Sequence, residues 1–172
     1  AQGYTGLNNP QGERFYIDLV AHELGHQLGA GHTFNATNSS NCEQSGRSID
    51  SAFEPGSGST IMSYAGICGS QNIQDDSDPY FHSISIQEIR TYVESFSGRR
   101  CGVEVKIENA IPKIQLPKNA YTIPAATPFV LSATATDANN DFLSFTWEQF
   151  DNGGTLGATS SLAEMNSDNG SN

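Results

Sequence analysis

Three histidines and one glutamate lie within a short stretch of the chain, His22 to His32, in the pattern H-E-x-x-H-x-x-G-x-x-H. On a helix with 3.6 residues per turn, His22 and His26 project from the same face and can bind one metal ion. Gly29 can take a positive φ and end the helix, which lets His32 supply a third nitrogen. Glu23 lies beside the first ligand, where a general base must lie. Three protein ligands leave a fourth position for water, so the pattern predicts a catalytic Zn²⁺ site.

The alternative is that these are ordinary helix residues whose histidines are satisfied by backbone or solvent. The additional glycine and histidine at the required offsets argue against that interpretation. His82 is the one histidine outside the motif, and it directly precedes a predicted helix. We expect a loop or capping role for it rather than a role at the metal.

A second motif, Thr60-Ile61-Met62-Ser63-Tyr64, follows about thirty residues after His32. Together the two motifs resemble those of metzincin metalloproteases, in which a methionine in a tight turn forms an apolar floor under the histidines. The resemblance gives Met62 that place, although a methionine can fill any core. In astacins and serralysins a tyrosine at the position of Tyr64 is a mobile zinc ligand and transition-state donor. The alternative is a phenol that only lines the substrate cleft.

The branch of the metzincins is indicated by the residues around these motifs. Thr33-Phe34 after the third histidine is similar to pappalysins, whereas the cysteine-bearing Met-turn region and the next helix resemble bacterial reprolysin-like (M12B-like) peptidases, which we favour. The resemblance covers residues 1–101. It implies a secreted zinc metalloendopeptidase that acts on a protein or peptide substrate. The alternative function is an extracellular surface-binding or adhesion module with a structural or inactive zinc site.

The composition agrees with export and excludes some partners. The 172 residues carry a net charge of −11 with only 8 Lys plus Arg, which argues against nucleic acid and anionic membranes as partners. No apolar run is long enough to span a membrane, and no oligomeric state is indicated. Two acidic turns could bind Ca²⁺, but they lack EF-hand spacing and solvated turns are favoured. These turns contain Asp75, Asp76 and Asp78, and Asp137 and Asp141.

The chain has three cysteines, Cys42, Cys68 and Cys101. A disulfide between Cys42 and Cys68 would join the loop after the zinc helix to the loop after the Met-turn. The alternative is three free thiols in a reducing cell. In reprolysins a cysteine at the position of Cys101 bridges to one upstream of the zinc helix, so the resemblance implies a partner outside this sequence.

Two helices and a long loop are predicted in the first hundred residues. Apolar periodicity before the motif predicts a helix over residues 15–28. Residues 35–59 are polar and glycine-rich, which predicts a loop that borders the substrate. Ser85-Ile86-Gln87-Glu88 has the form of a capping box, and Gly98 ends the apolar pattern that follows it. We therefore predict a second helix over residues 86–97.

These patterns predict an α+β chain with two incomplete domains. Residues 1–101 would form a metzincin catalytic domain truncated at its N-terminus, because too few residues precede His22 for the usual sheet and backing helix. Residues 102–128 would be a linker and first strand. Residues 129–172 resemble part of an immunoglobulin-like β-sandwich of the polycystic-kidney or cadherin-like type. In it, residues 129–136 and 143–150 would pair as a hairpin and Trp147 would fill the core.

Overall fold

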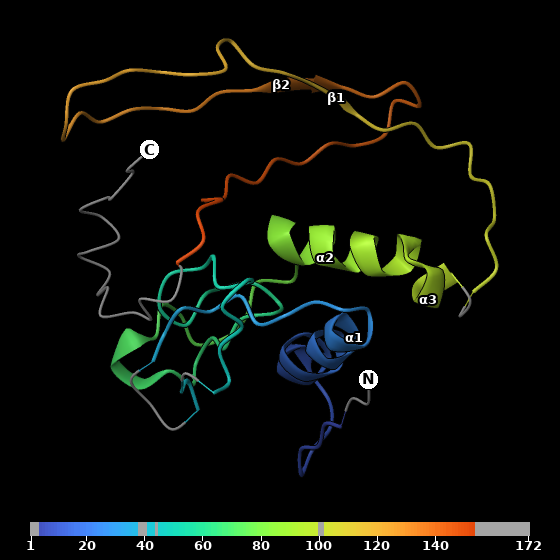
Figure 1. Cartoon of the computed structure of the whole chain (residues 1–172), viewed down its shortest axis with the longest axis vertical. Coiled ribbons are helices and arrows are strands. Elements are labelled where there is room, and N and C mark those ends of the chain that lie inside the picture. The colour runs from blue at the N-terminus through green and yellow to red at the C-terminus, as the bar shows by residue number, and fades with distance from the viewer. Residues whose placement is uncertain (1–3, 38–40, 44, 100–101, 154–172) are drawn as a thin grey trace. The chain divides into compact units, whose positions relative to one another are not determined.

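The computed structural model describes residues 4–37, 41–43, 45–99 and 102–153, which divide into two compact units. The first unit contains Ala1–Val103 together with Glu148–Asn172, and the second contains Glu104–Trp147. Helices lie in the first unit and a small antiparallel sheet lies in the second (Figure 1). The chain is therefore mixed helix and strand, as predicted, and each unit is described by itself.

The helix that carries the motif runs from Phe15 to Gln27. Its first part, η1 (Phe15–Ala21), is π-helical, and α1 (His22–Gln27) continues it as an α-helix. Gly29 follows with a φ of +94°, and a β-carbon at this position would lie 2.9 Å from Cβ of Tyr92. Only glycine tolerates both this left-handed conformation and this close approach. The predicted helix over residues 15–28 is thus confirmed, as is its termination at Gly29.

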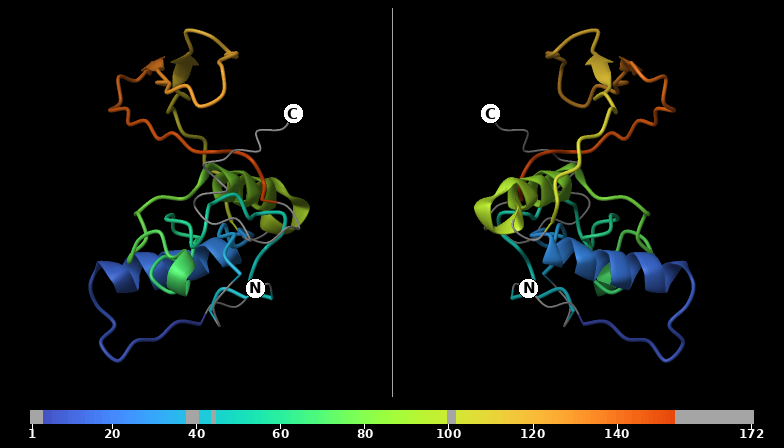
Figure 2. Two further views of the ribbon diagram at one scale, coloured as in Figure 1. Left: turned by 90° about the vertical axis from the view of Figure 1, so that its left-hand side faces the viewer. Right: turned by 90° about the vertical axis from the view of Figure 1, so that its right-hand side faces the viewer.

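Met62 is fully buried in a cluster with residues of the motif helix and of helix α2 (Ser83–Glu94). Figure 2 shows the ribbons of these helices from two sides. Its sulfur fills the space beside Gly25, where a β-carbon would lie only 2.3 Å from Sδ. A glycine at this point of the motif lets the helix approach the Met-turn directly. The cluster around Met62 also contains Ala30 and Ile61 and is flanked by Ile17, Ala21, Phe81 and Ile89.

The long segment between the two helices has little regular structure. It contains the one-turn 3₁₀ helix η2 (Gly69–Gln71) and a parallel β-bridge between Phe34 and Glu54. A disulfide joins the predicted pair Cys42 and Cys68, whose Cα atoms lie 5.3 Å apart. Both cysteines are buried in a second hydrophobic cluster with Phe34 and Ala36, and Tyr64 packs against it. Cys101 lies outside the described residues.

Helix α2 begins earlier than predicted, and its cap is a different residue. The main-chain N–H of Ile84 donates to Nδ1 of His82 at 3.2 Å, so His82 is the N-cap, in line with its expected role. Ser85 is fully buried inside the first turn, and the carboxylate of Glu88 bonds elsewhere. The predicted capping box is therefore wrong, because an imidazole nitrogen already satisfies the helix terminus. After Ser95, a short helix α3 (Phe96–Arg99) includes Gly98 rather than stopping before it.

The second unit contains one pair of short strands. Strand β1 (Lys113–Gln115) pairs with β2 (Thr134–Thr136) in antiparallel register, with Ile114 opposite Ala135. The predicted hairpin between residues 129–136 and 143–150 is wrong, because residues 134–136 pair with an earlier segment and residues 143–150 form no strand. Trp147 is 52% exposed and fills no core. Alternation along the sequence specifies which face a strand buries but not its partner strand.

Residues 148–153 return to the first unit. The carboxylate of Glu148 accepts a hydrogen bond from the Ser83 N–H at 2.8 Å, and Gly153 N–H donates to the Ala52 carbonyl at 2.8 Å. The proposed domain boundaries at residues 101 and 128 stay a prediction. Within the part of the chain that the structure describes, no helix is long and apolar enough to cross a membrane.

The close packing of Gly25 on Met62 leads to the first testable prediction. Met62 is fully buried and Phe81 lies 3.1 Å from the same point, so an added methyl group cannot be accommodated by a simple shift. Overpacking costs about 1–3 kcal/mol and removal of a helical glycine returns about 0.5–1, so the centres of the two ranges predict that Gly25→Ala loses about 1 kcal/mol in urea unfolding. Leu24→Ala, at a half-exposed position of the same helix, is the control and should lose less. A Gly25→Ala variant as stable as wild type would contradict this packing.

Candidate metal centre

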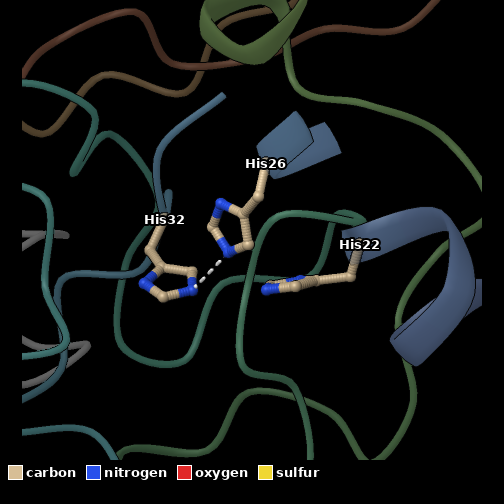
Figure 3. Close-up of side chains that lie close together, drawn as sticks. All are labelled: His22, His26 and His32. Atoms are coloured by element: carbon tan, nitrogen blue, oxygen red, sulfur yellow. Dashed lines mark hydrogen bonds between the residues drawn. The ribbon is translucent and has the colours of Figure 1, made fainter. Parts of the chain in front are cut away.

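The three histidines of the motif converge on one point (Figure 3). Their ligand nitrogens all lie within 4.8 Å of one another, and Nε2 of His26 lies 2.9 Å from Nε2 of His32. His22 and His26 come from successive turns of α1, and His32 comes from the loop after Gly29. The structure therefore brings together all three predicted ligands. They are the one group of three or more His, Cys, Asp or Glu side chains within ligand distance in the described ranges, so the acidic turns form no second group there.

The second nitrogen of each ring faces a main-chain carbonyl. Nδ1 of His22 lies 2.7 Å from the Ile61 oxygen, Nδ1 of His26 lies 2.8 Å from the Ala30 oxygen, and Nδ1 of His32 lies 2.5 Å from the Gly46 oxygen. A carbonyl only accepts, so each Nδ1 must carry the proton and donate it. In a neutral ring this leaves the Nε2 lone pair free. The carbonyls thus set both the tautomer and the direction of each imidazole, as is typical of metal-binding histidines.

The electrostatics of the cluster favour a cation at its centre. Burial lowers the pKa of His22 to about 4 and that of His32 to about 4, against the smaller opposing effect of their carbonyl partners. Both rings are therefore neutral at pH 7. Nε2 of His32 lies 2.9 Å from Nε2 of His26, and Nδ1 of both rings donates to a carbonyl, so a metal ion beside these two nitrogens could accept both lone pairs. Three imidazole nitrogens in this arrangement fit a divalent metal ion.

Tyr64 lies directly beside the histidines. Its ring centroid is 4.5 Å from that of His32 and 5.7 Å from that of His22, and its ring stacks on that of Phe34 at 4.5 Å. Burial raises the pKa of the Tyr64 phenol, and the negative charge of Glu23 raises it further. The phenol consequently remains a hydrogen-bond donor at neutral pH. Glu23 is half-buried on α1 directly after His22, and it lies near enough to Tyr64 for its charge to act on the phenol.

The Met-turn contacts the site through its main chain. The Ile61 carbonyl holds His22, and the Met62 carbonyl accepts a hydrogen bond from the Thr33 N–H at 3.0 Å. The side chain of Met62 packs on Gly25 in the motif helix. Met62 therefore supports the helix that carries two of the ligands as well as the loop after His32, while its place as a floor under the histidines stays a prediction.

Two carboxylates near His32 were not identified from the sequence. Glu54 bonds to Thr33, the residue after His32, and Glu88 accepts from the N–H of Gly31, the residue before it, at 2.9 Å. Glu54 lies in no motif, Glu88 was expected in a capping box rather than near the metal, and each is far from His32 in sequence. Nothing in the local pattern could identify these contacts, because they depend on how the loops fold back on one another.

Comparison with known proteins agrees with the class of site. A three-histidine centre with a carboxylate and a phenol beside it is the arrangement of a metallopeptidase. The family model described as Metallo-peptidase family M12B Reprolysin-like matches residues 1–93, so the chain belongs to the reprolysin-like M12B metallopeptidases. Searches of curated proteins and of solved structures found no match. The predicted reprolysin-like branch is thereby confirmed, while the pappalysin-like features and the immunoglobulin-like module stay predictions.

Replacement of single histidines tests the metal centre. His32→Ala removes one of three nitrogens, and we expect Zn²⁺ affinity to fall by more than about 100-fold, since loss of an outer-shell partner alone costs about 10–100-fold. His82→Ala is the control, because His82 is a histidine that caps α2 outside the cluster. That variant should lose about 1 kcal/mol of stability and keep its Zn²⁺. Bound zinc per chain can be measured by elemental analysis after dialysis, and His32→Ala with full zinc content would refute the assignment.

Proposed function

We propose that the chain is the catalytic part of a secreted zinc-dependent endopeptidase. The observation that carries the proposal is the convergence of three Nε2 lone pairs whose Nδ1 atoms face carbonyl oxygens, in a chain of the M12B family. His22, His26 and His32 would hold the metal. Zinc is favoured because it accepts imidazole nitrogen and commonly binds three protein ligands at catalytic sites, which leaves one position open.

Bound zinc would acidify a coordinated water and polarise the carbonyl of the scissile peptide bond. Glu23 would accept the proton of the attacking water and later deliver it to the leaving amine. Its position next to His22 on the helix, half-buried near Tyr64, supports this role. Glu23 needs no unusual acidity for this work, because its proton donor is already acidic.

Tyr64 would donate its hydroxyl to the oxyanion that forms on the substrate carbonyl. The phenol is adjacent to two of the three histidines, and its pKa is raised, so it keeps its proton at neutral pH. A donor that is already oriented by packing stabilises developing charge without reorganisation. The stack with Phe34 holds the ring in that orientation.

An extracellular location is supported by the disulfide and by the composition. Disulfides form and persist in oxidising compartments, and the bond between Cys42 and Cys68 closes the polar segment beside the metal centre. The net charge of −11 is unfavourable for binding to nucleic acid or to anionic lipid. The substrate is accordingly proposed to be an extracellular protein or peptide, and calcium has no proposed role.

The role of Glu23 is tested by a substitution that retains its shape. Glu23→Gln should keep one zinc per chain and lower casein cleavage by about 10²–10⁴-fold, the usual contribution of general acid and base catalysis. Glu13→Gln is the control. It makes the same change at an exposed carboxylate just before the motif helix and should leave cleavage unchanged. Activity of the wild-type chain should disappear on treatment with a chelator and return with Zn²⁺.

Two results would contradict the peptidase assignment. One is a zinc-loaded wild-type chain that cleaves no unstructured protein, and the other is undiminished cleavage by Glu23→Gln. A wild-type chain that binds zinc but cleaves no unstructured protein would favour the alternative, a surface-binding module with a structural or inactive zinc site. Catalysis has a use for a carboxylate beside the open metal position, whereas a structural site has none.

The role of Tyr64 is tested by removal of its hydroxyl alone. Tyr64→Phe should lower kcat for casein by about 10²-fold with zinc content and KM nearly unchanged, because the lost donor acts only in the transition state. Tyr16→Phe, on the exposed side of the motif helix, is the control. A change in KM with unaltered kcat would instead identify Tyr64 as a residue that only lines the substrate cleft.

A further inference from the structure

Glu54 is a buried carboxylate that the proposed reaction does not use. Glu54 is only 5% exposed, and both of its carboxylate oxygens accept hydrogen bonds. Oε1 accepts the main-chain N–H of Ser59 at 2.9 Å and that of Thr60 at 3.1 Å. Oε2 accepts the hydroxyl of Thr60 at 2.6 Å and also the hydroxyl of Thr33. Burial of a charge is costly, and four donors around one carboxylate compensate for it.

The partners of Glu54 lie next to two metal-site elements. Thr33 directly follows His32, and Thr60 directly precedes Ile61, whose carbonyl orients His22. The main chain adds a second link, because the Glu54 N–H donates to the Thr33 carbonyl at 2.9 Å. A single side chain therefore ties the loop of the third ligand to the turn that fixes the first.

Glu88 reaches the other side of the same ligand. From helix α2, its Oε2 accepts the Gly31 N–H at 2.9 Å and its Oε1 accepts the Ser51 hydroxyl at 2.5 Å. The ligand loop between them has no regular secondary structure to hold it, since α1 ends at Gln27. His32 is thus preceded and followed by residues that are each bonded to a carboxylate from a distant part of the chain.

We propose that Glu54 and Glu88 are positioning residues that hold the His32 loop from both sides and so set the affinity of the metal site. The proposal rests on the function proposed above only in that His22, His26 and His32 bind zinc. Neither carboxylate is placed at the reacting atoms. Each acts through the main chain or hydroxyl of a residue adjacent to His32, in the way that outer-shell partners tune metal ligands.

Alanine and glutamine substitutions at the two positions give opposite expectations. Glu54→Ala and Glu88→Ala remove the hydrogen-bond acceptors and should weaken Zn²⁺ binding by about 10–100-fold. Glu54→Gln can keep the geometry, because its carbonyl can accept the two main-chain N–H groups while its amide donates to hydroxyls that reverse their direction. The same holds for Glu88→Gln toward Gly31 and Ser51. Both glutamine variants should therefore bind Zn²⁺ far more tightly than the matching alanine variants.

The measurement is Zn²⁺ affinity by competition with a chromophoric chelator, on the whole chain, with circular dichroism to select conditions in which each variant is folded. Glu94→Ala is the matched control for Glu88→Ala, because Glu94 lies on the same helix and pairs with Arg90 at the surface. A merely structural role would lower the midpoint of unfolding of the metal-free chain and leave the Zn²⁺ affinity of the folded chain unchanged. Wild-type affinity in Glu54→Ala or in Glu88→Ala would overturn the proposal.

The test remains decisive if Glu54→Ala does not fold or if the wild-type chain cleaves nothing. If Glu54→Ala does not fold, Glu88→Ala with its glutamine counterpart decides, since Glu88 is only half-buried and its loss leaves the interior intact. Casein cleavage by the wild-type chain is measured on the same samples. Weakened zinc binding in the alanine variants without any wild-type cleavage would refute the peptidase function and support the positioning roles. Cleavage by the wild-type chain, together with unaltered zinc affinity in the alanine variants, would support the peptidase function and refute the positioning roles.

Discussion

The hydrogen bonds from three Nδ1–H groups to main-chain carbonyls constrain the rest of the first unit. The carbonyls belong to Ala30 after the motif helix, to Gly46 in the long loop and to Ile61 in the Met-turn. Three separate segments must therefore be held at hydrogen-bond distance from three rings. Once they are, the three Nε2 atoms converge and can present their lone pairs to one metal ion. Loop order and metal binding should consequently be coupled, because each supplies part of the free energy of the other.

The segments that provide these carbonyls are held by side chains rather than by a sheet. Met62 joins the motif helix to helix α2 through apolar packing, and the Cys42 to Cys68 disulfide closes the polar loop. Glu54 and Glu88 then connect the third-ligand loop to the Met-turn and to α2. Each of these contacts joins residues far apart in the chain. The geometry of the metal centre therefore depends on a few long-range contacts whose individual loss should be measurable.

Much of the site could be predicted from the sequence, because helical periodicity alone places His22 and His26 on one face and Gly29 can take the positive φ that ends the helix. The disulfide was also predictable from the two loops that it joins. Glu54 was not predictable, since its four donors come together only when two irregular segments fold. The cap of α2 was assigned to Ser85 because a serine followed by a glutamate three residues later is a common local signal, yet His82 competes successfully for the helix terminus. The hairpin prediction was wrong because the alternation of residues 134–136 does not specify a partner strand, and these residues pair with residues 113–115.

The coordination of the bound metal tests the central claim most directly. Zinc K-edge X-ray absorption of the zinc-loaded chain should show only nitrogen and oxygen neighbours, with a histidine signature from three imidazoles at about 2.0–2.1 Å and one further light atom. Long-range ¹⁵N NMR on the same sample should show all three rings coordinated through Nε2 with the proton on Nδ1. Sulfur neighbours, fewer than three imidazoles, or coordination through Nδ1 would contradict the account, since the carbonyls of Ala30, Gly46 and Ile61 could not then be the partners of the ligand rings.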